Sequence, residues 1–252
     1  MIKTKYLRPY CFLVTAFLIF FGMCIKVDAD QPPSALEYEG SSVVWSVGGT
    51  RVWRFPMAYA ADVTMMSDRF NGLYGGGFKL VDLNVAKKND KWSLCVRDQV
   101  LFSAIPEHGG VVRLNTQAMA LQWMSRIYEA VGELHASELT PEYKLRGGFD
   151  VATSISWYGD KFIGKKFANG EKFTESSLTA AAQNLPFGTL VKVTTPATGK
   201  SVVVRVTDRF KEKKNRALDI SHAAADLLGI KGMGVAKARI QVIGRVDLIG
   251  GK

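Results

Sequence analysis

The carboxylates in the C-terminal part of the chain are the side chains best suited to chemistry. Asp208 ends a strand-like run, SVVVRVTD, in which Val202, Val204 and Val206 alternate with other residues. Because alternate residues of a strand share a face, we expect Asp208 to continue this apolar row. Desolvation in such a row raises the pKa of a carboxyl group, which suits a general acid at neutral pH. The residues leave open that Asp208 only turns the chain or pairs with Arg209.

Two other carboxylates have weaker claims to a chemical role. Glu171 follows the turn pair Asn169-Gly170, and a solvated turn glutamate explains it equally well. Asp219 lies just before a predicted helix, where a hydrogen bond to the helix amides explains it better than catalysis does.

The elements around these residues are short strands separated by turns, with a single helix. Ser221 is a plausible N-cap for a helix over Ala223–Leu228, which Gly229 ends. Many short strands around one helix predict a small closed barrel over 149–252. The candidate strands are 153–158, 189–195, 201–207, 217–220 and 238–243.

The preceding segment, 36–136, predicts a small α+β domain with a two-fold repeat of strand, strand and helix. The pair Gly48-Gly49 between two apolar runs is typical of a hairpin. Helical spacing follows over 60–74 and again over 116–131, where Trp123 and Ile127 share a face. The Met and Trp residues here indicate a core. Nothing in 36–146 has the spacing of a metal site, a phosphate loop or a nucleophile triad, and we expect no cofactor and no metal.

The first 29 residues have the layout of a signal peptide. Basic residues precede an uncharged run of 15 residues, 11–25, and cleavage is expected after Ala29. An uncleaved anchor is the alternative. Met23 precedes Cys24 where lipidation requires a small residue, so we expect an exported protein of the periplasm or envelope without a lipid. The segments 30–35 and 137–148 are rich in turn-forming residues and predict linkers.

Cysteine and charge limit the choices further. Removal of 1–29 would leave Cys95 alone, so a disulfide within the chain is not expected. Residues 30–148 contain 12 basic and 13 acidic residues, whereas 149–252 contain 17 and 9, a net charge of +8. Such a basic surface on an exported protein attracts anionic polymers or lipid headgroups. No nucleic-acid motif accompanies the charge, and nucleic acid is not an expected partner.

Residues 149–250 contain an ordered series of motifs that resembles the rare lipoprotein A (RlpA) family. Each motif is weak alone, but the order is specific. The matching segments are 156–159 (SWYG), 168–171 (ANGE), 178–181 (LTAA), 185–189 (LPFGT), 202–205 (VVVR), 208–209 (DR) and 218–221 (LDIS).

The resemblance implies a six-stranded double-psi β-barrel with an open groove and lytic transglycosylase activity on the glycan strands of peptidoglycan. In that reaction one acid protonates the glycosidic oxygen, and the sugar's own 6-hydroxyl attacks the anomeric carbon, so a second carboxylate is not obligatory. Asp208 is the first candidate for the acid, and Glu171 matches a family carboxylate that faces the groove. The resemblance also suggests substrate-binding residues: Tyr158, Asn169, Thr179, Arg209 and Asp219.

The aromatic pair Trp157-Tyr158 gives this groove a candidate sugar platform. Neighbouring strand residues face opposite sides, so one ring enters the core and the other can stack on a sugar. We expect Tyr158 to be the exposed ring.

The chain departs from the family at two places. Ala182 stands where the family usually has a histidine, so an imidazole that could relay a proton is absent. The family's glycine-proline turn is replaced by the basic segment 210–214, which either reshapes the groove rim or is a solvated loop. Two readings therefore remain: an enzyme that cleaves peptidoglycan, and a non-catalytic module that binds or loosens the wall. A third assigns the function to 36–146.

Overall fold

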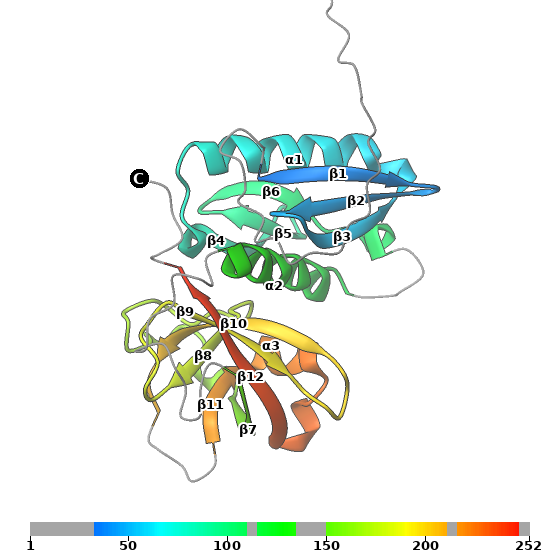
Figure 1. The fold of residues 1–252 in the computed structure, drawn as a ribbon. Coiled ribbons are helices and arrows are strands. Elements are labelled where there is room, and N and C mark those ends of the chain that lie inside the picture. Colours follow the sequence, from blue (N-terminus) through cyan, green and yellow to red (C-terminus); the bar gives the residue numbers. More distant parts are fainter. Residues whose placement is uncertain (1–32, 110–114, 135–149, 211–215, 247–252) are drawn as a thin grey trace, which may run out of the picture. The chain divides into compact units, whose positions relative to one another are not determined.

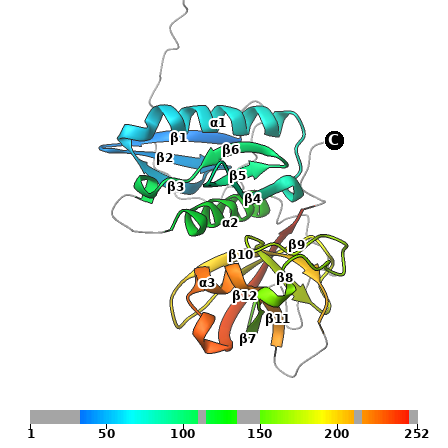
Figure 2. The same ribbon diagram turned by 180° about the vertical axis from the view of Figure 1, so that it is seen from behind.

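A computed structural model describes residues 33–109, 115–134, 150–210 and 216–246. The N-terminal part contains two three-stranded antiparallel sheets, each followed by a helix. Figures 1 and 2 show α1 on one side of these strands and α2 on the other. The first set is β1 (Ser34–Glu39), β2 (Ser42–Val47), β3 (Thr50–Pro56) and α1 (Ala60–Gly75), and the second is β4 (Leu83–Lys88), β5 (Lys91–Val96), β6 (Gln99–Ser103) and α2 (Thr116–Leu134).

Tight turns with left-handed residues make these hairpins. Gly48 and Gly49 join β2 to β3 with φ of 54° and 79°, and Asn89 and Asp90 join β4 to β5 with φ of 47° and 60°. Two-residue turns with positive φ match the twist of the strands they connect. The hairpin expected at Gly48-Gly49 is confirmed, and the predicted helices agree with α1 and α2.

Helix α2 is buried on nearly every side. From Met119 to Gly132 only Gln122 and Arg126 escape burial. One face of α2 contacts β3, β4 and β5, and another contacts the barrel strands β9, β10 and β12. A helix with apolar residues all round is typical of the interior of a protein, and α2 lies in such a place.

The C-terminal part is a closed barrel with the strand order β10-β8-β11-β7-β12-β9. Two of its neighbouring pairs are parallel, β10 with β8 and β11 with β7, and the other four are antiparallel. The five predicted strands are present, and β8 is an additional one. The strands are β7 (Asp150–Tyr158), β8 (Thr179–Ala182), β9 (Thr189–Thr194), β10 (Ser201–Asp208), β11 (Arg216–Ser221) and β12 (Val235–Arg245).

The predicted late helix is α3 (His222–Leu228). The Ser221 hydroxyl accepts a hydrogen bond from the Ala224 amide, and Gly229 ends the helix in the left-handed conformation at φ 71°. Both capping predictions are confirmed. Short 3₁₀ turns complete the described elements: η1 (Met57–Tyr59), η2 (Leu80–Asp82), η3 (Pro106–Gly109), η6 (Asp160–Phe162) and η7 (Lys231–Met233).

The predicted signal peptide, the linker 137–148 and most of the basic segment 210–214 fall outside the described residues. Within the described residues, no helix has the length and apolar character needed to span a membrane.

Candidate functional site

A row of residues across adjacent barrel strands brings two carboxylates to one surface. Asp208 of β10 pairs with Ala181 of β8, Ala181 pairs with Asp219 of β11, and Asp219 pairs with Ser156 of β7. Residues paired across a ladder face the same side. Two strand spacings separate the Cα atoms of Asp208 and Asp219, which is about 10 Å.

A β-bulge determines which side Asp208 faces. The register of β10 against β8 shifts between Val206, which pairs with Ala180, and Asp208, which pairs with Ala181. The expectation that Asp208 continues the apolar row of Val202, Val204 and Val206 is therefore wrong. A bulge inserts an extra residue, here Thr207, and this reverses the alternation beyond it.

The Asp208 carboxylate is fixed through one of its oxygens. Oδ1 accepts hydrogen bonds from the Ala168 amide at 3.0 Å and from the Arg209 amide at 2.8 Å. Asp208 is half-buried. The backbone thus orients the carboxylate and leaves Oδ2 without a hydrogen bond among the described residues.

Asp219 and the aromatic pair line a pocket of about 360 Å³. Asp219 Oδ1 accepts a hydrogen bond from the Ser156 hydroxyl at 2.6 Å. Trp157 and Tyr158 are both half-buried, so the two rings share the exposure that was expected of Tyr158 alone. The remaining lining residues are Ser156, Gly159, Lys161, Phe162, Phe210 and Arg216.

Tyr158 is linked to β8 through its hydroxyl. Its Oη lies 2.6 Å from Thr179 Oγ1, and its ring meets Phe173 edge to face with the centroids 5.1 Å apart. Burial raises the pKa of Tyr158, and the charges of Asp208 and Asp219 raise it further. Tyr158 is therefore close enough to interact electrostatically with both carboxylates, and it remains a neutral phenol.

Glu171 is committed to an ion pair. The Arg205 guanidinium donates two hydrogen bonds to the Glu171 carboxylate, from Nη1 to Oε1 at 2.7 Å and from Nη2 to Oε2 at 2.6 Å. The Asn169 side-chain Nδ2 donates a third hydrogen bond to Glu171 Oε1 at 2.9 Å. Burial alone would raise the pKa of Glu171, but the hydrogen bonds and charge of Arg205 outweigh it and the pKa is lowered. An ionised carboxylate held in this way is poorly suited to donate a proton.

Arg209 and Ala182 lie together at the end of β8. Arg209 Nη1 donates to the Ala182 carbonyl at 3.1 Å, and its guanidinium lies 3.9 Å from the centroid of the Phe187 ring. Ala182 is 1% exposed and pairs with Leu218. A buried methyl group thus lies at the position where the resemblance led us to expect a histidine.

His222 does not replace that histidine. Its Nδ1 bonds to Asp160, and its ring stacks on Trp157 with the centroids 5.4 Å apart. Sequence reasoning also missed the parts played by Ser156 and Arg205. The position of Arg205 was a usable signal, because a charged residue within an apolar strand needs a buried partner.

The comparisons with known proteins concern mainly the barrel. Residues 150–240 match a family described as lytic transglycolase. The endolytic peptidoglycan transglycosylase RlpA of Rickettsia typhi is 43% identical over 119 residues, which are 46% of this chain and 35% of that protein. An RlpA protein of Synechocystis sp. is 34% identical over 170 residues, which are 63% of this chain and 51% of that protein. The chain thus spans about a third and about half of these relatives.

The Synechocystis match extends beyond the barrel. Residues 149–252 number 104 of 252, so an alignment over 63% of the chain must include residues that precede the barrel. Among solved structures, an expansin of Clavibacter michiganensis is 20% identical with a TM-score of 0.30 and covers 37% of this chain and 50% of that one. The motif order, the closed six-stranded barrel and the family match agree: residues 150–240 match the lytic transglycolase family and are similar to the corresponding part of RlpA proteins.

Proposed function

We propose that this chain is an envelope protein that cleaves peptidoglycan glycan strands as an endolytic lytic transglycosylase, with the barrel as its catalytic part. The observation that carries the proposal is Asp208, a half-buried carboxylate held by two backbone amides, in the same row across the strands as Asp219, which lines a pocket with aromatic rings. The relatives that match this domain at 43% identity are named for that activity.

Asp208 acts as the acid and then as the base. Protonated Asp208 gives its proton to the glycosidic oxygen while the bond from that oxygen to the anomeric carbon breaks. The 6-hydroxyl of the same sugar then attacks the anomeric carbon and returns a proton to Asp208, which closes an anhydro ring. No water is consumed. Asp219, at about 10 Å by strand spacing, stabilises the positive charge that develops on the sugar ring.

The remaining candidate residues have two kinds of role, which follow from the contacts of their side chains: some shape the site and others contact the substrate. Asn169 and Glu171 bond to each other and Thr179 bonds to Tyr158, so these residues shape the site. The rings of Trp157 and Tyr158 supply an apolar wall on which a sugar can stack. Arg209, at the edge of the row, is positioned to meet an anionic group of the substrate.

A second function is favoured by one observation, the buried alanine at position 182. A site that lacks the family histidine and keeps the groove fits a module that binds or loosens the wall without cutting it. The two functions differ in their products, because only the enzyme leaves anhydro-sugar ends.

The experiment is mass analysis of purified peptidoglycan after incubation with the protein. We expect anhydro ends with the wild type, none with Asp208→Asn, and unchanged binding to wall sacculi by that variant, since the amide keeps the shape and cannot donate the proton. Asp226→Asn is the matched control, because Asp226 is exposed on α3. A wild type that binds sacculi but gives no product would support the wall-binding function, and anhydro product from Asp208→Asn would show that another residue is the acid.

A further inference from the structure

Arg205 lies where the N-terminal part meets the barrel. It is 8% exposed and belongs to β10, and Tyr128 of α2 is 3% exposed beside it. The Tyr128 hydroxyl donates a hydrogen bond to the Leu83 carbonyl at 3.4 Å, and Tyr128 lines the same pocket as Arg205 and Glu171. Burial raises the pKa of Tyr128, and the nearby Arg205 guanidinium opposes this rise. The guanidinium therefore binds Glu171 of the barrel and shares a pocket with a tyrosine of the N-terminal part.

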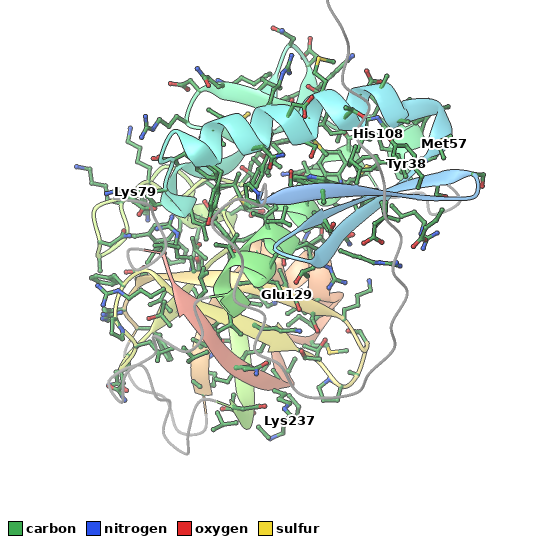
Figure 3. The ribbon with its side chains drawn as sticks, turned by 45° about the horizontal axis from the view of Figure 1, so that its top comes forward. Tyr38, Met57, Lys79, His108, Glu129 and Lys237 are labelled. Carbon is green, nitrogen blue, oxygen red and sulfur yellow. The ribbon has the colours of Figure 1, made fainter. Side chains whose placement is uncertain are left out.

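The contact between α2 and the barrel is built from specific bonds. The Val203 amide donates to Ser125 Oγ at 2.9 Å. Glu129 is 7% exposed and pairs with Lys192 of β9 and with Arg126 of its own helix. Figure 3 labels Glu129 on α2. Such buried and oriented polar contacts fix the position of α2 against β9 and β10.

Glu171 belongs to a tight turn that reaches Asp208. The Phe167 amide donates to the Glu171 carbonyl at 2.8 Å, and Gly170 takes φ 91° to close the turn. Asn169 bonds to Glu171 by its side chain, and its amide donates to the Thr207 carbonyl at 3.2 Å. In the same turn, the Ala168 amide holds Asp208 Oδ1 at 3.0 Å.

The turn is not held by tight packing on the side of the N-terminal part. A pocket of about 170 Å³ lies there, lined by Leu83 and Tyr128 from the N-terminal part and by Phe167, Glu171 and Arg205 from the barrel. Beside this space, the Arg205 ion pair holds the Glu171 carboxylate, while Ser176 binds the Val85 carbonyl and ties the following segment to the N-terminal part.

We infer that Tyr128 is a positioning residue for Asp208: through Arg205 and Glu171 it fixes the turn whose Ala168 amide orients the catalytic carboxylate. The N-terminal part thereby completes the barrel's site without touching the substrate. This inference rests on the proposed function only where turnover is the readout, because the geometry of the turn can be measured without activity.

The test is Tyr128→Phe in the full chain, which keeps the buried ring and removes the hydroxyl. We expect faster hydrogen exchange of the Ala168 and Asn169 amides, measured by NMR. We also expect a fall in kcat of about tenfold with KM unchanged on soluble glycan strands, as is typical when a supporting group is lost from a site. Ser125→Ala is the control, since it removes a bond between α2 and the barrel that does not lead to the turn.

A double-mutant cycle separates positioning from general stability. If Tyr128 acts through Glu171, then Tyr128→Phe should add little to the effect of Glu171→Gln on exchange at Ala168. Equal effects of Tyr128→Phe and Ser125→Ala on exchange, or full additivity with Glu171→Gln, would overturn the inference. A wild type without anhydro product would refute the enzyme and leave the exchange measurement to decide the role of Tyr128.

Discussion

At the scale of single residues, the site depends on where a strand loses its alternation. The bulge at Thr207 turns Asp208 away from the valine row and toward Ala181 and Asp219. Sequence could name the carboxylates, because their types and motif positions are visible in the chain. The sequence could not show which face of β10 carries Asp208, because one residue inserted by a bulge reverses the alternation of faces. It also could not show that Glu171 pairs with Arg205, because the two residues are 34 positions apart along the chain.

Ala182→His tests whether the family histidine can be restored by one substitution. Ala182 is 1% exposed and faces Leu218, so an imidazole must displace its neighbours. We expect the free energy of unfolding to fall by about 1–3 kcal/mol, as in other overpacked cores. Urea unfolding measures the change, and Gln183→His is the control because Gln183 is the exposed next residue. Equal stability of the two variants would show that position 182 has room for an imidazole.

At the scale of elements, α2 packs against two sets of strands within one hydrophobic core. One buried face of this helix was predicted, with Trp123 and Ile127 on it. Contact with both β3–β5 and the barrel strands was not, since the 3.6-residue period of an amphipathic helix predicts only one buried stripe. Strand β8 was missed for a related reason. Its sequence, Thr-Ala-Ala-Ala, favours helix by local propensity, and its pairing with β10 and β11 overrides that preference.

Two helical glycines allow the packing of α2 to be measured. A methyl group at Gly132 would lie 3.2 Å from the Ile243 side chain, whereas one at Gly72 of α1 would meet nothing within 4 Å. Gly72→Ala should therefore raise the free energy of unfolding by about 0.5–1 kcal/mol, the usual gain from replacing a helical glycine. Gly132→Ala should show no gain or a loss. Thermal unfolding compares the two, and equal gains would mean that α2 and β12 are less tightly packed than described.

The short turn η3 predicts a dependence of stability on pH. His108 is buried in an aromatic cluster, with Phe102 stacked on it at 4.8 Å between centroids, and burial lowers its pKa from 6.5 to about 4. Between these pH values His108 is protonated in the unfolded chain but neutral in the folded chain. The free energy of unfolding therefore decreases as pH falls from about 6.5 to 4.

A shift in the pKa of His108 from 6.5 to about 4 corresponds to a loss on the order of 3 kcal/mol. His108→Phe keeps a ring in the cluster and has no proton to bind. The difference in unfolding free energy between wild type and His108→Phe should shift in favour of the variant as pH falls through this range, and urea unfolding at pH 7, 5.5 and 4 measures it. A difference that stays constant with pH would contradict the assignment.

At the scale of the whole molecule, charge is divided unevenly between the two parts. Residues 149–252 have a net charge of +8, and 30–148 have a net charge of −1. Long-range attraction to the anionic wall should therefore come from the barrel, and salt should weaken it by screening.

Cosedimentation of the protein with wall sacculi tests this division. The bound fraction should fall as salt rises from low to physiological concentration and above. Lys237→Glu on β12 should lower it at low salt, whereas Lys79→Glu in the N-terminal part should not; both lysines are exposed and labelled in Figure 3. Binding that ignores salt, or equal losses in the two variants, would indicate that stacking and shape dominate.

The double burial of α2 also constrains how the chain comes to fold during its synthesis. The helix ends at Leu134, while β9, β10 and β12, the strands it packs against, end only at Thr194, Asp208 and Arg245. Until about a hundred more residues have been added, its second apolar face has nothing to cover it. A nascent chain at this stage exposes apolar surface and is prone to aggregation. A fragment that ends near residue 148 should therefore aggregate rather than fold as an independent domain.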